Sequence, residues 1–329
     1  MHHVTDPIDQ TLLNDWQRDF PLVDRPFATL GRAVDITEDE VITRLSRMRK
    51  SGRITRVGAT ITPGTVSAST LAAVATPPEQ IEEIAALIDA EPGVNHNYLR
   101  EDHWNLWFVA TGPDTDHVEA TLARIERRTG LKVMDLRLVR PFNVDLGFCM
   151  RGDTRVVPKP RTADTSVMQP GDKQVLQVLT RGLPITSEPF AEIAAQLNRD
   201  VTEVMHRIDI LTRAAIISRL GVIVRHRALG WSANAMVVWN LSPDQIDLAG
   251  PALAAHPGVS LCYERRPVEG HWPYRLYSMI HARSRSEALA TLQNATTLPE
   301  LADVEHKVLF STRCFKQTGA MITQREVAA

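Results

Sequence analysis

The sequence predicts an α+β fold of two tandem halves, each a winged helix-turn-helix followed by a ferredoxin-like βαββαβ unit. Three observations predict it. The chain repeats itself with a period of about 165 residues, which is too long for a solenoid and indicates two related domains in tandem. Each half begins with helical segments and continues with alternating strands and helices. Between the halves, Arg151–Asp172 is rich in proline, charge and small polar residues, as is typical of an extended linker.

The repeat rests on motifs that recur in the same order in both halves. The matched segments are Pro26–Ala28 with Pro189–Ala191, Gly58 with Gly221, Glu91–Tyr98 with His256–Tyr263, Asn105–Thr111 with Arg275–His281, and Leu136–Phe142 with Leu309–Phe315. The predicted boundaries are a winged helix at 1–62, a ferredoxin-like ligand domain at 63–150, a linker at 151–171, a second winged helix at 172–228 and a second ligand domain at 229–329. Because such units usually pair, we expect the halves to form an internal pseudo-dimer.

Helical periodicity opens the chain. Apolar side chains recur near a spacing of 3.6 residues, which favours amphipathic helices. These positions are Leu12, Leu13, Trp16 and Phe20, then Val41, Leu45 and Met48. Thr37 precedes the second series, and Glu40 lies three residues further on, which predicts a capping box. In the second half Asp200 or Thr202 takes the capping position.

A β-rich stretch follows in each half, at 53–61 and 216–224, in the position of a wing. The βαββαβ order comes next. In the first half it runs through a strand at 69–76, a helix at 77–90, strands at 93–100 and 105–111, a helix at 115–130 and a strand at 132–139. The second half repeats it between 232 and 312.

Composition and charge are those of an ordinary globular protein. Hydrophobic residues make up 43% and charged residues 23% of the chain, and the net charge is −2. The three cysteines are scattered and form no C-x-x-C pair, so we expect neither a disulfide scaffold nor a zinc ribbon. The N-terminus lacks the apolar core of a signal peptide, and no apolar run is long enough to span a bilayer. We therefore expect a cytoplasmic protein.

The winged helices raise the question of DNA binding. A recognition helix needs its first residues free to meet bases and phosphates. Here the expected starts, Ile36–Glu40 and Arg199–Glu203, carry three and two acidic residues, which repel phosphate. The basic residues Arg44, Arg47, Arg49 and Lys50 lie further along the first of these helices. The charge pattern therefore disfavours DNA as a partner.

A winged helix followed by a βαββαβ unit resembles the Lrp/AsnC regulators, once per half over nearly the whole chain. Three segments are similar, more closely, to the sirohaem decarboxylase family, Lrp/AsnC-like proteins of haem d1 and alternative haem biosynthesis. They are "HNYLREDHWNLWF" (His96–Phe108), "RLGVIVRHRALGWSANAMVVW" (Arg219–Trp239) and "CYERRPVEGHWPYRLYSMIH" (Cys262–His281). The first half resembles one partner of these enzymes and the second half the other, so the chain resembles a fused D–L type.

The resemblance implies removal of CO2 from the C12 and C18 acetate side chains of sirohaem, giving 12,18-didecarboxysirohaem. It implies sirohaem and this product as ligands, and other proteins of haem d1 biosynthesis as partners. No separate cofactor is expected, because the reaction needs no redox change and the iron is carried by the substrate. A homodimer of the fused chain stays open. The alternatives are a ligand-responsive Lrp/AsnC-type transcriptional regulator and a haem-binding protein without catalysis.

A flat ring rimmed by carboxylates calls for arginines, whose planar forks bind carboxylates in a bidentate way, and for aromatic walls. The resemblance and these chemical needs select a set of substrate-binding candidates. They are Tyr98, His103, Trp107, Arg140, Arg225, Arg227, Tyr263, Arg265, Tyr274, Arg275, Tyr277 and Arg313.

Decarboxylation also needs an acid that returns a proton, and histidine suits this role. The motifs contain His96, His103, His226, His271 and His281. The predicted catalytic residues are His96, His226, His271 and Arg100, and the first three of these are also the candidates for an axial ligand to the substrate iron.

Strand alternation places His96, Tyr98 and Arg100 on one face, which suits an anionic flat ligand. It places His226 opposite Arg225 and Arg227, unless the strand bends there.

One position departs from the family pattern. In the repeat, His96 aligns with Leu261, where the second half of the family pattern has a histidine. We therefore expect two inequivalent half-sites, with His271 as a compensating imidazole.

Overall fold

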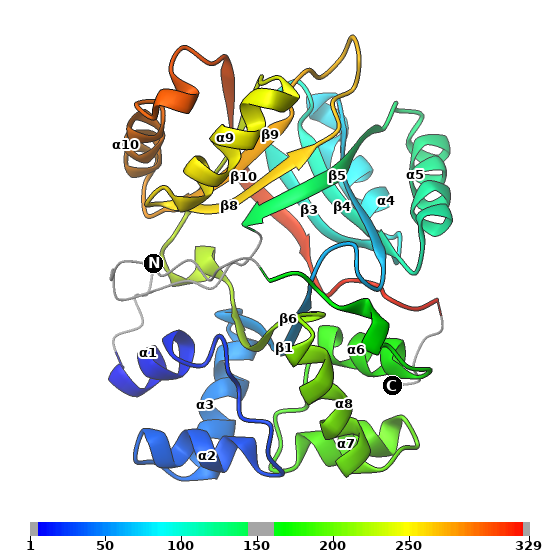
Figure 1. The fold of residues 1–329 in the computed structure, drawn as a ribbon, viewed down its shortest axis with the longest axis vertical. Coiled ribbons are helices and arrows are strands. Elements are labelled where there is room, and N and C mark those ends of the chain that lie inside the picture. Colours follow the sequence, from blue (N-terminus) through cyan, green and yellow to red (C-terminus); the bar gives the residue numbers. More distant parts are fainter. Residues whose placement is uncertain (1–5, 144–160, 325–329) are drawn as a thin grey trace.

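The computed structural model describes residues 6–143 and 161–324. The chain forms a helical layer and a closed barrel, with one pair of wing strands between them (Figure 1). Both halves contribute to all three parts, so the predicted pseudo-dimer is intertwined rather than two separate lobes.

The helical layer contains the helix-turn-helix segments of both halves. Its helices are α1 (Pro7–Asn14), α2 (Pro26–Ala33) and α3 (Glu38–Lys50), and α6 (Asp172–Arg181), α7 (Pro189–Gln196) and α8 (Val201–Arg213). Thr37 Oγ1 caps α3 by accepting from the Glu40 amide at 3.2 Å, and Asp200 caps α8 by accepting from the Glu203 amide at 3.0 Å. The expected capping box is only half formed, because the Glu40 carboxylate accepts from Arg44 instead.

The apolar series from Leu12 to Phe20 is not one helix, contrary to the prediction. Helix α1 ends at Asn14, and Asp19 adopts a left-handed backbone with φ of 52°. Phe20 is still buried, and its amide donates to the Leu220 carbonyl of the other half. A helix-like spacing of apolar residues can therefore continue through a turn when the segments before and after the turn pack against the same core.

The wing strands β1 (Ile54–Ile61) and β6 (Ile217–Val224) pair with each other, antiparallel and across the halves. Gly58 lies opposite Gly221. A Cβ at Gly58 would lie 2.5 Å from the Leu179 carbonyl oxygen, and one at Gly221 would lie 2.5 Å from the Trp16 carbonyl oxygen. Only glycine lets each first-helix segment approach the strand of the other half so closely.

The barrel joins two four-stranded sheets at both edges. Its strands are β2 (Ala68–Val74), β3 (Val94–Arg100), β4 (Leu106–Gly112) and β5 (Met134–Asn143), and β7 (Ala233–Trp239), β8 (Val259–Arg265), β9 (Leu276–Ala282) and β10 (His306–Gln317). Within the halves the orders are β5-β2-β4-β3 and β10-β7-β9-β8, as the ferredoxin-like pattern predicts. The long last strands then cross over, β10 to β3 and β5 to β8, and close the barrel.

Helices cover the outside of the barrel (Figure 1). They are α4 (Ile81–Asp89) and α5 (Thr115–Thr129) on the first half, α9 (Pro243–Ala255) and α10 (Arg285–Ala295) on the second, with short 3-10 turns at η1 (Pro78–Gln80) and η4 (Pro299–Leu301). A further 3-10 turn, η3 (His226–Leu229), follows β6 and lies between the wing strands and the barrel. Separate apolar cores lie under each helix pair and within the helical layer. A further core, with Trp107, Trp272 and Tyr277, fills part of the barrel interior.

The predicted linker 151–171 lies partly outside the described residues, which resume at 161. Its described part contains the 3-10 turn η2 (Thr165–Val167) and is bonded to α8, since the Arg207 guanidinium donates to the Val167 carbonyl at 2.7 Å. Among the described helices, none is long and apolar enough to cross a membrane.

Candidate active site

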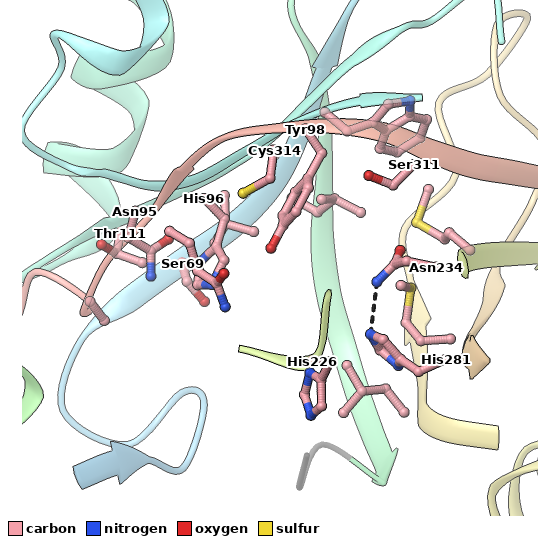
Figure 2. A pocket seen from close by; sticks show the side chains of 18 of the residues that line it. Ser69, Asn95, His96, Tyr98, Thr111, His226, Asn234, His281, Ser311 and Cys314 are labelled. Carbon is pink, nitrogen blue, oxygen red and sulfur yellow. Dashed lines mark hydrogen bonds between the residues drawn. The ribbon is translucent and has the colours of Figure 1, made fainter. Parts of the chain in front are cut away.

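A cavity of about 840 Å³ lies between the barrel and the wing strands. All eight barrel strands contribute to its lining, together with the end of β1 and the segments that follow β1 and β6. Figure 2 shows His96, Asn95, Ser69 and Thr111 on one side of it, with His226 and His281 on the other. The two expected half-sites therefore meet in one shared cavity.

His96 projects from β3 into the cavity together with Tyr98 and Arg100, as strand alternation predicts. The His96 and Tyr98 rings stack with centroids 6.2 Å apart, and the Arg100 guanidinium lies 5.6 Å from the Tyr98 ring centroid. Burial, together with the Arg56 cation, lowers the pKa of His96 to about 4. The imidazole of the protein alone is therefore neutral at neutral pH. Burial also raises the pKa of Tyr98.

His226 reaches the cavity because the chain bends directly after the wing. Strand β6 ends at Val224 and the turn η3 begins at His226. Strand alternation no longer applies there, so Arg225, His226 and Arg227 all line the cavity. The bend that the sequence left open is thus present. The His226 and His281 rings lie with centroids 5.0 Å apart.

His281 is held at both ring nitrogens. Nδ1 lies 2.6 Å from Ser260 Oγ, and that hydroxyl donates to the Met279 carbonyl at 2.9 Å. The serine oxygen must then accept from Nδ1–H, so Nε2 carries the lone pair and accepts from the Asn234 amide nitrogen at 2.7 Å (Figure 2). This network favours the Nδ1–H tautomer of His281.

The cavity is strongly cationic. The arginines that line it are Arg100, Arg225, Arg227, Arg265 and Arg313, and the described lining includes no aspartate, glutamate or lysine. Arg100 is only 6% exposed, and burial lowers its pKa to about 10. Arg313 at the rim forms an ion pair with Glu82. Such a concentration of positive charge, flanked by apolar and aromatic walls, suits a polyanionic ligand with a flat apolar body.

The two halves line the cavity with matched strands, but each half carries its histidine at a different position of the repeat. Leu261 lines it at the position matched to His96, as the sequence implies. His281 lines it at the position matched to Thr111. Each half therefore places one imidazole from its barrel sheet into the cavity, but from a different strand.

Three predicted site residues lie in or near the connecting turns and strand ends, away from the cavity lining. His103 is exposed between β3 and β4, and His271 is exposed between β8 and β9, where Nε2 lies 3.2 Å from Lys132 Nζ. His271 is therefore not the compensating imidazole that the sequence suggested. Arg140 points outward, and its Nε donates to Glu264 at 2.7 Å, because register shifts in β5 flank it.

Three more predicted residues belong to the barrel core or its edge. Tyr277 is fully buried and its hydroxyl accepts from Trp272 Nε1 at 2.8 Å. The Tyr274 hydroxyl donates to Glu305 at 3.2 Å. Arg275 precedes β9 and is also absent from the described cavity lining. The remaining predicted residues do meet in the cavity; they are His96, Tyr98, Arg100, Trp107, Arg225, His226, Arg227, Tyr263, Arg265 and Arg313.

Several polar residues of the cavity were not chosen from the sequence, and two of them, His281 and Asn234, are bonded to each other. His281 was among the motif histidines, and the repeat already aligned it with Thr111. Asn234 shares a strand face with Met236, which alternation along 233–239 would have indicated. The ferredoxin-like order already predicted that β7 and β9 are neighbours, so what the sequence lacked was the register that places Asn234 opposite His281.

Two family models match the chain, each in both halves. The model described as "AsnC-like ligand binding domain" matches residues 66–143 and 228–316. The model described as "Siroheme decarboxylase NirDL-like HTH domain" matches residues 9–54 and 172–217. Together they cover most of the chain.

Similar proteins agree with these models. The chain is 53% identical to a "Siroheme decarboxylase NirDL subunit" of Paracoccus pantotrophus, over 98% of this chain and 99% of that one. It is 52% identical to the protein of the same description from Paracoccus denitrificans, with the same shares.

Two solved structures match at 25% identity. One is a crystal structure of the siroheme decarboxylase NirDL, with a TM-score of 0.68 over 97% of this chain and 95% of that one. The other is NirDL in co-complex with an iron-uroporphyrin III analogue, with a TM-score of 0.65 over 95% and 92%. The chain therefore belongs to the sirohaem decarboxylase family of AsnC-like proteins and is a decarboxylating enzyme, a carboxy-lyase.

Proposed function

We propose that this enzyme removes CO2 from the C12 and C18 acetate side chains of sirohaem in haem d1 biosynthesis and releases 12,18-didecarboxysirohaem. The observation that carries the proposal is the cavity, whose arginines have no acidic neighbour among the described lining residues. Carboxylates around a flat ring would neutralise these cations, while Trp107 and Tyr263 offer aromatic contact to the ring. The relative in co-complex with an iron-uroporphyrin III analogue supports a ligand of this type.

The chemistry requires one proton for each CO2. The bond between the acetate methylene and its carboxylate breaks, CO2 leaves, and the methylene carbon takes up a proton to become a methyl group. We assign proton donation to His96. The lowered pKa makes this imidazole neutral in the protein alone, and bound carboxylates would add negative charge beside it and favour uptake of a proton to form the imidazolium.

The iron comes with the substrate, and no separate cofactor takes part in this proposal. Axial ligation of iron needs a neutral imidazole. His96 and His226 line the cavity and are the two remaining candidates from the sequence, because His271 lies outside it. We further propose that the enzyme acts in the cytoplasm and hands its product to other proteins of haem d1 biosynthesis; dimerisation of the fused chain stays a prediction.

The structure gives a physical reason to set the regulator alternative aside. Arg44 of α3 bonds to Asp6 at 2.9 Å and to Asp9 at 2.8 Å, so this cation is neutralised by the N-terminal helix. At the matched position of α8, Arg207 is buried against Asp172 at 2.7 Å. Cations engaged in this way are not available to DNA phosphates.

Anaerobic incubation of the purified protein with sirohaem, followed by mass spectrometry, separates the three hypotheses. Loss of two carboxyl groups supports the proposal. A Soret shift without a mass change indicates a haem-binding protein without catalysis. No spectral change, together with salt-dependent retardation of promoter DNA, indicates a regulator.

A further inference from the structure

Arg100 and Arg265 occupy matched positions of the repeat and are held in the same way. Each crosses to the last strand of the other half. Arg100 Nη1 donates to the Leu309 carbonyl at 3.0 Å, and Arg265 Nη1 donates to the Leu136 carbonyl at 2.7 Å. In both side chains Nε is buried and has no hydrogen-bond partner in the described parts of the chain.

This arrangement leaves the same edge of each guanidinium to a ligand. Nη1 is engaged by the protein, and within the described residues the Nε–Nη2 edge is not. An arginine edge of this kind binds both oxygens of a carboxylate with parallel hydrogen bonds. A buried cation that lacks an acidic partner also favours an anionic ligand, because pairing offsets its desolvation. The cavity lining therefore includes two related arginine edges that suit carboxylates, one at Arg100 and one at Arg265.

The Arg100 site has a second support that the Arg265 site lacks. Arg100 Nη1 also donates to Asn234 Oδ1 at 3.1 Å. The Asn234 amide cannot flip freely, because its nitrogen donates to His281 Nε2, and His281 is fixed in turn by Ser260. A series of hydrogen bonds thus leads from Ser260 through His281 and Asn234 to the Arg100 guanidinium.

The matched residues of the first half cannot form this series of hydrogen bonds. Asn234 corresponds to Ser69, and His281 corresponds to Thr111. Thr111 Oγ1 instead donates to the Gly93 carbonyl at 3.0 Å and accepts from the Met321 amide at 2.9 Å. Both arginines lie over the matched tyrosine, Arg100 at 5.6 Å from the Tyr98 centroid and Arg265 at 4.6 Å from the Tyr263 centroid, so the aromatic contact is shared and the Asn234 bond is not. The two sites are related by the repeat, but of these two arginines only Arg100 has a hydrogen bond from its guanidinium to a side chain among the described residues.

We propose that Asn234, held by His281, is a positioning residue that fixes the carboxylate-binding edge of Arg100, so that the two decarboxylations depend unequally on it. The proposal rests on the proposed function. Loss of Asn234 slows the decarboxylation whose substrate pose depends on the Arg100 site more than the other, and a singly decarboxylated product accumulates.

The test compares Asn234→Ala with wild type and with Asn240→Ala. Asn240 follows the same strand, is exposed, and bonds Glu305, so its loss is a matched control. Titration with iron-uroporphyrin III, followed at the Soret band, measures binding without turnover. Since a hydrogen bond to a charged group contributes about 1.5–3 kcal/mol, we expect Asn234→Ala to bind about tenfold to a hundredfold more weakly. Asn240→Ala binds as wild type does.

The product ratio and the histidine tautomer complete the test. With sirohaem, Asn234→Ala gives a higher ratio of singly to doubly decarboxylated product, which a general loss of stability does not produce. Nitrogen NMR of the wild type shows His281 as the Nδ1–H tautomer. If Asn234→Ala does not fold, Ser260→Ala removes the first hydrogen bond of the same series and should shift the product ratio in the same direction.

Wild-type affinity together with an unchanged product ratio in Asn234→Ala, or in Ser260→Ala where only that variant folds, overturns the proposal. Failure of every form, wild type included, to decarboxylate sirohaem overturns the proposed function instead; the titration with iron-uroporphyrin III then still tests the positioning of Arg100.

Discussion

Replacing His96 by asparagine should change how the stability of the empty enzyme depends on pH. Burial lowers the pKa of His96 from 6.5 to about 4. Between pH 6.5 and about pH 4 the imidazole is protonated in the unfolded chain but not in the folded chain, so stability is lost as the pH falls through this range. At about pH 5 the loss from this one group amounts to about 2 kcal/mol relative to pH 8. His96→Asn removes it.

The assay is urea unfolding of wild type, His96→Asn and His306→Asn at several pH values between about 8 and about 5. His306 is exposed, so its replacement is the matched control. We expect the wild type and the control to lose about 2 kcal/mol more than His96→Asn over this range. Parallel curves for all three proteins would refute the burial argument for His96 and, with it, the proposal that substrate charge protonates this residue.

Three further predictions concern the fold and the regulator alternative. Asp172→Asn leaves the buried Arg207 cation without its charge partner and should lower the free energy of unfolding by about 3–5 kcal/mol in denaturant titrations, whereas Asp209→Asn at an exposed pair should change it by less than about 1 kcal/mol. Gly221→Ala places a Cβ 2.5 Å from the Trp16 carbonyl and should lower the thermal unfolding midpoint markedly; an unchanged midpoint contradicts the close approach of the halves. In gel retardation at physiological salt the protein should leave promoter DNA unshifted, and a sequence-specific shift would contradict the argument that the cations of α3 and α8 are engaged within the protein.

Local order could be predicted well from the sequence. The strands expected at 93–100 and 105–111 are β3 and β4 within a residue or so at each end, and the helix expected from Thr115 is α5. Alternation along β3 also placed His96, Tyr98 and Arg100 correctly toward one cavity. These features depend on neighbours in the chain, which is why a periodic pattern predicts them.

The features that depend on distant segments could not be predicted. The wing strands pair across the halves, and β5 and β10 cross to close the barrel, through contacts between residues more than 100 positions apart. The same holds for the site, because its residues come from distant segments of the chain. His271 resembled a replacement for the histidine missing at Leu261, but His281 enters the cavity instead, because Asn234 and Ser260 on neighbouring strands hold it there.

The central claim is that the cationic cavity decarboxylates two acetate side chains of one sirohaem molecule. The most direct measurement is the amount of CO2 released per sirohaem consumed under anaerobic conditions, with the side chains of the product assigned by NMR. The account predicts two CO2 per sirohaem and methyl groups at C12 and C18. Release of no CO2, or loss of carboxyl groups from the propionate side chains, would contradict it.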